Sequence, residues 1–574
     1  MIAGFSELKK NLKKDFSGMP EIRMAVLADS ASQLFSQAIK GYGFTQQLQI
    51  NVWEAEYDRI YESVMDESSN LYSFKPKFVV IFQSARKLLS RFNKKNEDGK
   101  RNFAANQLEQ FEQLNATINS RLTCKIIYLN FAEINDQVFG NFGNKTVHSF
   151  IYQLRKINFE LMQLSAQTAN MNIADLSTLQ NQYGQAVLTS DRLYINADNV
   201  LNIDALGYVA KMITDIILAY TGKFKKCLIL DLDNTLWGGI IGDDGIENIQ
   251  IGDLGIGKAF TEFQLWIKQL QQRGIILTVC SKNTEHIAKE PFEKHPDMIL
   301  RTDDIAVFVA NWENKVNNIR QIQSILNIGF DAMVFLDDNP AEREIVRMNI
   351  PEICVPELPE DPAEYLSFLY NEQLFETVSF TEEDKKRTKQ YQEEAQRNKI
   401  QASYVNEEEF LQSLQMKAGI ISIDKFTVPR AAQLSQRSNQ FNLRTIRYNE
   451  EDIKAIIADD TKYTFTVSLN DKFGDYGLIS LLIAEKREND KLFIDTWIMS
   501  CRVLKRGVEN LVLNHLVKLA LEKGFTSIVG EYLPTAKNGL VKDHYKNLGF
   551  VQAASQWHLD VKEYAAKIIF IESL

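Results

Sequence analysis

The sequence has little of what marks a secreted protein or a cysteine-based metal module. Only five of its 574 residues are cysteines, they stand apart, and no two form a CxxC pair. This spacing argues against a disulfide framework and against a cysteine-ligated zinc site, and it is typical of a reduced compartment. We therefore expect a cytoplasmic protein.

Long apolar runs and long basic tracts are missing as well. No segment approaches the roughly 18 apolar residues of a membrane-spanning helix. The basic, amphipathic start "MIAGFSELKKNLKKDF" lacks the apolar core and cleavage site of a secretion signal. The formal net charge is -10, whereas nucleic-acid binding needs a concentrated positive surface. We expect no membrane span and no nucleic-acid partner.

The length calls for several domains, because a prior of about 150 residues per domain gives three or four. We predict an α/β layer domain at 1–220, a second α/β unit at 221–372, a charged helical linker at 373–416 and an α+β domain at 417–574. The linker sequence "TEEDKKRTKQYQEEAQRNK", which starts at Thr381, is typical of a surface helix. The fold class is therefore multidomain α/β.

The stretch "CLILDLDNTLWGG", residues 227–239, puts two carboxylates where a buried strand ends. Folding alone gives no reason for this, because unpaired buried charge is costly. Two further predicted strands, "GIILTVC" and "MVFLDD", also end on polar or small residues. Ligands of doubly wound sheets bind at the carboxyl ends of the strands, so we expect the side chains that follow these three strands to converge.

These side chains form a set suited to phosphoryl transfer. Carboxylate oxygens hold Mg²⁺, one carboxylate can attack phosphorus and another can carry the leaving-group proton. A hydroxyl and a lysine stabilise the phosphoryl oxygens. A second acidic pair, Asp243–Asp244 in "IIGDDG", is interpreted as a turn. The set itself comprises Asp231, Asp233, Thr235, Ser281, Lys315, Asp337 and Asp338.

The order DxDxT, serine after a strand, lysine before a helix and a strand ending in DD resembles the haloacid dehalogenase superfamily. The strings "DLDNTLWGGIIGDDG", "CSKN", "NWENK" and "FLDDNPAERE" resemble its FkbH-like, class IIIC branch. The resemblance implies a Rossmann-like core, with Asp231 as nucleophile, Asp233 as acid/base and Lys315 stabilising the intermediate. It implies phosphate binding by Thr235, Ser281, Lys282 and Asn283, and Mg²⁺ binding by Asp231, Asp233, Asp337 and Asp338.

FkbH-like proteins are associated with loading a glyceryl unit from 1,3-bisphosphoglycerate onto an acyl carrier protein, with loss of phosphate. The resemblance therefore implies a phosphorylated small molecule as substrate and an acyl carrier protein as partner. Cys280, beside Ser281, is a candidate for a transient thioester, and inert packing is the alternative. A simple phosphomonoester hydrolase and a non-catalytic scaffold also stay open.

Residues 417–574 resemble the GNAT acyltransferase fold, which binds acyl-CoA through backbone amides at a helix start. The implied ligand is acyl-CoA or a phosphopantetheine-bearing carrier. Lys505 replaces the first glycine of the phosphate-binding loop, so an active and an inactive domain are equally open. The amide-rich run "QLSQRSNQFN" is either a solvated helix face or a functional surface. The implied acyl-CoA contacts are Arg502, Lys505, Arg506, Gly507 and Tyr545.

The N-terminal domain loosely resembles the SGNH hydrolase fold, with Ser30 of "LADSAS" in the nucleophile position. A serine hydrolase also needs a base, but no DxxH motif lies near the end of this domain, and His148 is the one histidine in the first 220 residues. We therefore interpret Ser30 as a helix N-cap and the domain as a non-catalytic scaffold or binding surface.

Overall fold

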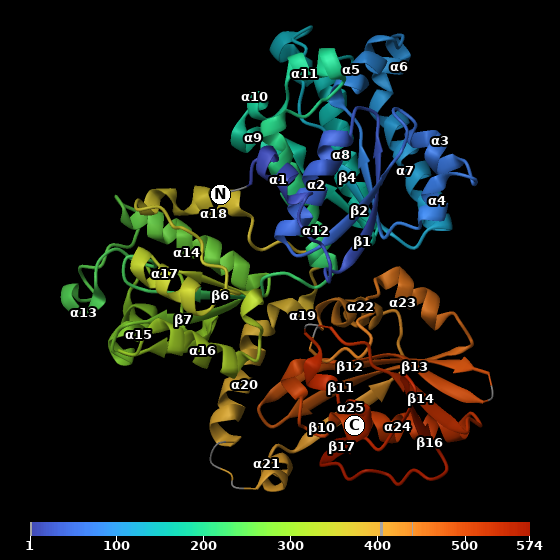
Figure 1. Ribbon diagram of the computed structural model, residues 1–574. Helices are drawn as coiled ribbons and strands as arrows, with labels where there is room; N and C mark the ends of the chain where they lie inside the picture. Colours follow the sequence, from blue (N-terminus) through green and yellow to red (C-terminus); the bar gives the residue numbers. More distant parts are fainter. Residues whose placement is uncertain (1–2, 402–403, 405, 439, 489, 536) are drawn as a thin grey trace. The chain divides into compact units, whose positions relative to one another are not determined.

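The structure is a computed structural model that describes residues 3–401, 404, 406–438, 440–488, 490–535 and 537–574 (Figure 1). The chain divides into two compact units, Met1–Ala219 and Tyr220–Leu574. This division falls at the end of the first predicted domain. The other three predicted segments lie together in the second unit.

The first unit is built on a parallel five-stranded sheet in the order β2-β1-β3-β4-β5. Helices cover both of its faces (Figure 1), which explains why a run such as "FVVIF" at 78–82 is apolar and buried at every position. The strands predicted from "IRMAVLADS", "KFVVIF" and "CKIIYLNF" are β1, β3 and β4. The strands are β1 (Glu21–Ala28), β2 (Gln49–Glu54), β3 (Phe78–Phe82), β4 (Lys125–Leu129) and β5 (Met171–Ala174).

The helices that lie between β1 and β5 in sequence form the crossover connections, while α1 precedes β1 and the helices from α9 onward follow β5. The longest are α2 (Gln33–Thr45), α7 (Phe103–Arg121), α8 (Phe150–Gln167) and α12 (Leu206–Tyr220). The others are α1 (Phe5–Asn11), α3 (Ile60–Met65), α4 (Asn70–Phe74), α5 (Ala85–Asn93), α6 (Glu97–Arg101), α9 (Leu176–Tyr183), α10 (Gln185–Leu188), α11 (Asp191–Ala197), and the 3₁₀ helices η1 (Gly140–Lys145) and η2 (Ile203–Ala205).

Ser30 is not the N-cap of the helix that follows β1. The N-cap of α2 is Ser32, so the interpretation of Ser30 as a cap is wrong. The Ser30 side chain is buried, and its hydroxyl has no hydrogen-bond partner among the described residues. The helix begins two residues later than expected, because Asp29 is still bound to the neighbouring strand: its backbone N–H donates to the Phe82 carbonyl.

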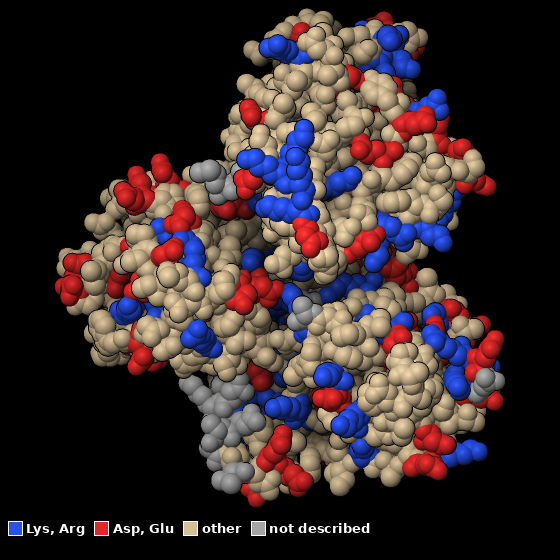
Figure 2. Space-filling view, in the orientation of Figure 1, with Lys and Arg blue, Asp and Glu red and all other residues tan. Residues whose placement is uncertain are grey.

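Positive charge is unevenly spread over the first unit. Lys9 and Lys10 lie on α1, and Lys13 and Lys14 follow it closely. Figure 2 shows basic side chains gathered over this region, while both signs of charge mix over the rest of the face in view. The negative net charge therefore conceals a local basic patch, and the absence of a nucleic-acid partner stays a prediction.

The second unit begins with a parallel four-stranded sheet in the order β8-β7-β6-β9. Alternate side chains of β6 enter different cores: Leu228 and Leu230 pack with α14, whereas Cys227 and Ile229 pack with α16. This is the burial on both faces that the apolar strands predict. The strands are β6 (Cys227–Leu230), β7 (Ile276–Ser281), β8 (Ile305–Ala310) and β9 (Met333–Leu336).

The helices around this sheet are short. They are α13 (Ile241–Asp244), α14 (Gly257–Gln272), α15 (Glu285–Lys294), α16 (Lys315–Leu326), α17 (Pro340–Asn349), α18 (Tyr365–Glu372), and the 3₁₀ helices η3 (Thr302–Asp304), η4 (Phe330–Ala332) and η5 (Pro362–Glu364). Only α13 and α14 lie between Asp233 and Ser281, so this insertion contains no additional folded cap domain.

The predicted linker helix is buried, which corrects the expectation of a surface helix. Helix α20 packs against β8 and α16, and its Thr388 and Tyr391 are buried. Arg397, only 1% exposed, donates from Nε to Asp471 Oδ2 at 2.7 Å. Its charged residues therefore serve as internal ion-pair partners. The helices of this segment are α19 (Glu382–Lys385), α20 (Arg387–Gln401) and α21 (Glu407–Ser413).

The C-terminal part carries a mixed eight-stranded sheet in the order β15-β16-β14-β13-β12-β11-β10-β17. Strands β13 and β14 run parallel but pair only over Lys491–Phe493. Beyond this point the segment 441–443 bridges them, because Met499 N–H donates to the Phe441 carbonyl and Leu533 N–H to the Leu443 carbonyl. The strands are β10 (Met416–Ile421), β11 (Lys462–Asp471), β12 (Gly474–Arg487), β13 (Lys491–Met499), β14 (Ser527–Glu531), β15 (Val551–Ala553), β16 (Gln556–Asp560) and β17 (Ile571–Ser573).

The helices of this part lie between those strands in sequence. They are α22 (Val428–Arg437), α23 (Glu450–Ile457), α24 (Val508–Glu522), α25 (His544–Asn547), and the 3₁₀ helices η6 (Cys501–Val503) and η7 (Gly539–Val541). None of the helices in the described parts of the chain combines the length and apolarity needed to cross a bilayer.

Candidate active site

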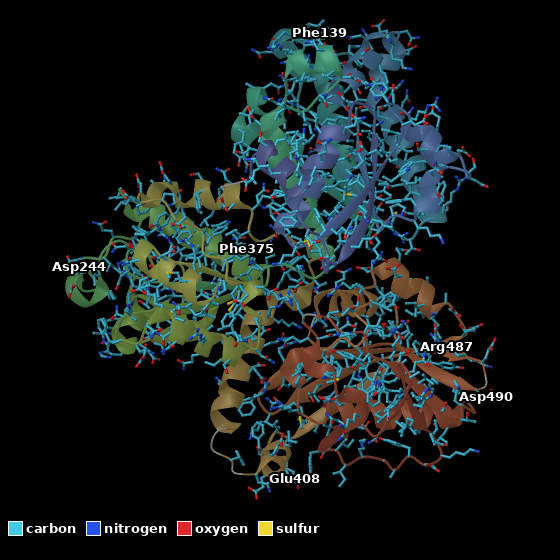
Figure 3. All side chains as sticks on the ribbon, viewed as in Figure 1. Phe139, Asp244, Phe375, Glu408, Arg487 and Asp490 are labelled. Carbon is cyan, nitrogen blue, oxygen red and sulfur yellow. The ribbon has the colours of Figure 1, made fainter. Side chains whose placement is uncertain are left out.

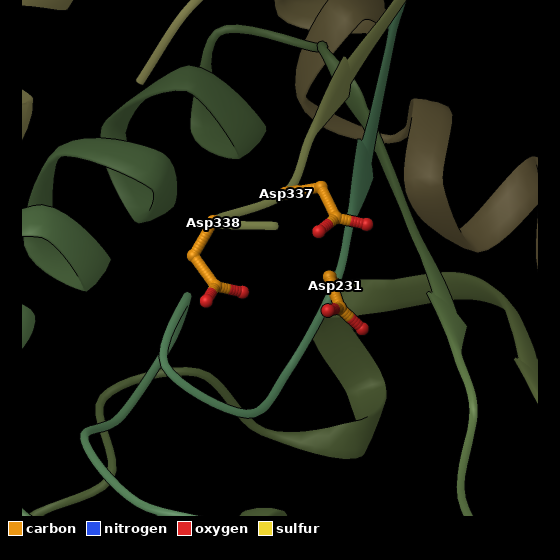
Figure 4. Close-up of side chains that lie close together, drawn as sticks. All are labelled: Asp231, Asp337 and Asp338. Carbon is orange, nitrogen blue, oxygen red and sulfur yellow. The ribbon is translucent and has the colours of Figure 1, made fainter. Parts of the chain in front are cut away.

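Three carboxylates meet where β6 and β9 end. Asp231 follows β6 directly, and Asp337 and Asp338 follow β9. The two strands pair in register up to Leu230 and Leu336, and Asp231 N–H donates to the Leu336 carbonyl at 3.0 Å. The ligand oxygens of the three carboxylates lie within 4.8 Å of one another, and Figure 4 shows them facing a common point. The parallel register thus brings together residues that are about 100 positions apart in the sequence.

Lys315 lies between two of these carboxylates. It is the first residue of α16, its side chain is 4% exposed, and its Nζ lies 2.8 Å from Asp231 Oδ2 and 2.5 Å from Asp337 Oδ2. Burial lowers the pKa of Lys315, but the attraction of Asp231 and Asp337 outweighs burial and leaves the pKa above its ordinary value. The lysine therefore stays charged.

One ammonium does not neutralise three carboxylates. Burial, reinforced by the charge of Asp231, raises the pKa of Asp337 to about 7 although Lys315 opposes the rise. Burial and the same neighbour also raise the pKa of Asp338. The surplus of buried negative charge and the all-oxygen donor set fit a hard divalent cation such as Mg²⁺.

The Asp233 carboxylate lies outside this cluster. Its Oδ1 accepts from Trp237 Nε1 and from the Ile241 N–H, both at 3.0 Å, and its Oδ2 accepts from Asn283 Nδ2 at 3.2 Å. Burial raises the pKa of Asp233, and the hydrogen bonds oppose this. Its donors hold the carboxylate in one orientation near Asp231. The acid/base and metal roles of Asp233 stay predictions.

The four residues predicted to bind phosphate have different surroundings. The Ser281 hydroxyl, at the end of β7, has no hydrogen-bond partner among the described residues. Thr235 Oγ1 accepts from the Asp338 N–H at 3.1 Å, so this hydroxyl positions the acidic loop. Lys282 is 40% exposed and its Nζ lies 2.5 Å from Glu342 Oε1, while Asn283 binds Asp233. The Ser281 side chain is only 2% exposed, and its role in phosphate binding stays a prediction.

Cys280 is buried in a core cluster, which favours the inert-packing alternative, and its thioester role stays a prediction. The residue is fully buried, in the core that contains Ile229 and Phe335. Burial raises the pKa of its thiol far above the ordinary value. A thiol that is neither exposed nor ionised is a poor nucleophile. The alternation of side chains along β7 places this sulfur on the face that α16 covers.

Asp243 and Asp244 lie away from the acidic cluster. Both are exposed on the short helix α13, and Asp244 Oδ2 accepts from the Ile240 N–H at 2.7 Å. Figure 3 labels Asp244 at the outer edge of this part of the chain. The pair belongs to one helical turn rather than to an irregular turn.

Comparison with known proteins bears on this site. Residues 23–218 match the family described as FkbH, N-terminal domain. The crystal structure of the N-terminal part of BF1531 from Bacteroides fragilis, described as containing a phosphatase domain and complexed with Mg, is 50% identical. It covers 66% of this chain and 100% of its own, with a TM-score of 0.64. The chain belongs to the FkbH-like family. A comparison with curated proteins found no match.

Acetyltransferase structures match about a quarter of this FkbH-like chain at a low level. A ribosomal-protein alanine N-acetyltransferase from Escherichia coli and a mutant of spermidine N-acetyltransferase SpeG from Vibrio cholerae are 15% and 13% identical. Each covers 26% of this chain, and 98% and 96% of its own, with a TM-score of 0.21. Nothing about acyl transfer follows from such a likeness, and the GNAT assignment stays a prediction.

The predicted acyl-CoA loop of the FkbH-like chain is occupied by its own helix α20. Arg506 is buried and its Nη2 lies 2.9 Å from Glu394 Oε1, while Arg502 donates to Gln390. Lys505 has a φ of +61°, in the region that favours glycine, and Gly507, with a φ of +81°, precedes α24. Arg506 is thus paired with a carboxylate of α20, whereas Arg502 contacts only a neutral amide of that helix.

Tyr545 is also buried, with 1% exposure, against Gly530. A Cβ added at Gly530 would lie 2.3 Å from Tyr545 Cζ, so the ring fills the space beside β14. The side chains of Arg506 and Tyr545 are both packed inside the protein in this arrangement, and their contacts with acyl-CoA stay predictions.

Three residues that sequence reasoning missed hold the acidic site of the FkbH-like chain in place. Arg343 Nη1 donates to the carbonyls of Asp337 and Asp338 at 2.8 and 2.7 Å. Asn339 caps α17 and donates its N–H to Asp337 Oδ1 at 2.9 Å, and Trp237 holds Asp233. The Asn-Pro pair in "DDNPAERE" marks a helix start, but a side chain that binds backbone carbonyls leaves no such pattern.

Proposed function

We propose that the chain is a Mg²⁺-dependent phosphatase or phosphotransferase that acts through an aspartyl-phosphate on Asp231. The observation that carries this proposal is the cluster of Asp231, Asp337 and Asp338 around Lys315, at the carboxyl ends of β6 and β9. The 50% identical relative crystallised with Mg supports it. The isolated cysteines support a cytoplasmic location.

Asp231 is the nucleophile in this proposal. One of its carboxylate oxygens bonds to phosphorus while the bond from phosphorus to the leaving oxygen breaks. Lys315, 2.8 Å from Asp231 Oδ2, stabilises the negative charge that gathers around the transferred group. The Ser281 hydroxyl donates to a phosphoryl oxygen. Mg²⁺, held by Asp231, Asp337 and Asp338, supplies positive charge to the phosphoryl oxygens when it is bound.

Asp233 moves the proton. Burial raises the pKa of Asp233, so this carboxyl group keeps its proton to a higher pH than a solvated aspartic acid does. In its protonated form it gives the proton to the leaving oxygen. The resulting carboxylate then accepts a proton from water as that water attacks phosphorus. Phosphate leaves and Asp231 is restored. Trp237 and Asn283 keep Asp233 oriented through both steps.

We further propose 1,3-bisphosphoglycerate as the substrate and an acyl carrier protein as the acceptor. Support for this comes from the FkbH family match. In this reaction the carrier thiol attacks the acyl carbon and phosphate leaves, while Asp231 removes the phosphate from the other end of the molecule. The burial of Cys280 favours transfer directly to the carrier thiol. A simple phosphomonoester hydrolase would use the same carboxylates without a carrier.

The test is phosphate release with Mg²⁺ from 1,3-bisphosphoglycerate and a panel of phosphomonoesters, with and without an acyl carrier protein. We expect Asp231→Asn to abolish release and Asp243→Asn, an exposed carboxylate on α13, to leave it unchanged. Mass spectrometry of the carrier detects a glyceryl adduct if loading occurs. Release without an adduct identifies a plain phosphatase. Absence of release from every substrate contradicts the proposal and favours a scaffold.

A further inference from the structure

A cavity of about 380 Å³ in the second unit lies at the other end of the phosphatase sheet. Its lining includes Lys226, which precedes β6, and Ile276, the first residue of β7. Asp231 lies five residues beyond Lys226, about 16 Å along the strand. We propose that this cavity binds a phosphate-bearing small molecule at a site separate from the Asp231 cluster.

The cavity has an excess of positive charge. One carboxylate, Asp331, lies in the lining, and it pairs with Lys537. Lys223 stands between the lining residues Gly222 and Phe224; burial lowers its pKa, and the charge of Lys537 lowers it further. The cations in the lining are Lys226, Arg387, Arg430, Arg502 and Lys537.

Arg502 supplies a cation whose contacts are all neutral. Its guanidinium donates to Ser500 Oγ at 3.3 Å, to the Tyr476 carbonyl at 3.4 Å and to Gln390 Oε1. None of these acceptors carries a charge, so the positive charge of Arg502 is not compensated locally. Arg387, by contrast, is paired with Asp384. A phosphate in the cavity would provide the counter-charge, because charge-assisted contacts to phosphate suit arginine geometry.

The amide-rich run "QLSQRSNQFN" forms one wall of the same cavity through Gln433, Ser438 and Gln440. Gln440 Oε1 is buried and has no hydrogen-bond partner among the described residues. A buried, unsatisfied carbonyl oxygen calls for a donor, such as a hydroxyl or amide of a ligand. The run is therefore part of a binding surface rather than a solvated helix face.

Apolar side chains complete the lining. Phe224, Ile276 and Phe441 offer hydrocarbon surface beside the cations. Ligand sites of this kind combine a mostly apolar wall with a few placed polar groups. The chemical class that fits is a phosphate monoester or phosphonate with a small apolar body and at least one hydrogen-bonding group.

The test uses the full chain carrying Asp231→Asn, in EDTA, so that hydrolysis and metal binding are removed. Phenylphosphonate, which combines an anion with an aromatic ring and resists hydrolysis, is titrated by calorimetry. We expect one saturable site whose affinity falls as salt is added, and no binding of the neutral benzyl alcohol. Arg502→Gln should weaken binding by about tenfold or more, as expected for loss of a charged partner. Lys417→Gln, which removes an exposed lysine outside the cavity, should leave binding unchanged.

Three further outcomes decide the matter. Absence of saturable binding overturns the proposal. Binding that survives Arg502→Gln but is lost in Ser281→Ala or Lys282→Gln also overturns it, because the ligand is then in the phosphatase site. If Arg502→Gln fails to fold, as judged by its thermal transition, Lys537→Gln takes its place, because Lys537 also lines the cavity. Unchanged affinity in that variant counts against the cavity. Failure here leaves the phosphatase proposal untouched, since the Asp231 chemistry is absent from the assay.

Discussion

Replacing Lys315 with methionine tests whether surplus negative charge defines the acidic site. The methionine fills similar space but removes the ammonium that lies 2.8 Å from Asp231 and 2.5 Å from Asp337. Loss of one partner from a buried ion pair costs about 3–5 kcal/mol, and Lys315 serves two carboxylates while only 4% exposed. We expect the metal-free Lys315→Met chain to lose stability locally by about this amount. Added Mg²⁺ should recover part of the loss, because the cation replaces the missing positive charge.

Hydrogen exchange of the β6 and β9 peptides measures this effect, since it reports local opening without requiring two-state unfolding of a long chain. Lys268→Met is the matched control. Lys268 pairs with Asp304 at 2.5 Å but is 28% exposed, so its loss should cost about 1 kcal/mol or less. If β6 and β9 exchange as slowly in metal-free Lys315→Met as in the unaltered chain, the reasoning about charge surplus is refuted.

Three other predictions concern different parts of the chain. Burial raises the pKa of Asp29 to about 7, so the folded state holds this proton more tightly and the stability around β1 should fall as pH rises from about 4 to about 7. Asp29→Asn should flatten this pH dependence in hydrogen-exchange measurements, and an unchanged slope contradicts the assignment. Arg343→Met should raise the Mg²⁺ concentration for half-maximal phosphate release by about 10–100-fold, with Arg347→Met as control, because only Arg343 binds the Asp337 and Asp338 carbonyls. Gly530→Ala should lower the stability of the C-terminal sheet by about 1–3 kcal/mol through its clash with Tyr545. Adding Tyr545→Leu to the same chain should recover part of this lost stability. A thermal transition of Gly530→Ala that does not move would argue against tight packing between Gly530 and Tyr545.

The sequence pattern predicts where the strands lie better than it predicts which helices are buried. Apolar runs locate β6, β7 and β9, but the equally apolar "IAVFVA" of β8 is not among the predicted strands, although the motif "NWENK" follows it directly. Helix α20 was expected on the surface since its composition is highly charged. Composition does not distinguish a solvated charge from a buried pair such as Arg397 with Asp471, and only the partner's position resolves the difference.

The candidate site, too, could be predicted from the sequence only in part. Parallel strands end at a common edge, so the spacing of motifs was enough to anticipate the meeting of Asp231, Asp337 and Asp338. The face of β7 on which Cys280 lies could not be read from an apolar run in which every position is buried. Arg343 could not be anticipated either, because its partners are backbone carbonyls that any residue supplies.

Strand β6 connects the two ends of the phosphatase sheet, since Lys226 precedes it and Asp231 follows it. Its neighbours hold it at both ends. At the start of the strand, the Lys226 N–H donates to the Ala332 carbonyl, and the Lys226 carbonyl accepts from the Ile276 N–H. At the other end, the Asp231 N–H donates to the Leu336 carbonyl. A strand bonded in this way can tilt but cannot stretch or slip by part of a residue. Any coupling between the two sites is reciprocal by thermodynamic linkage, so a phosphate analogue at Asp231 must change the affinity of the proposed cavity beside Lys226 by the same factor as the reverse.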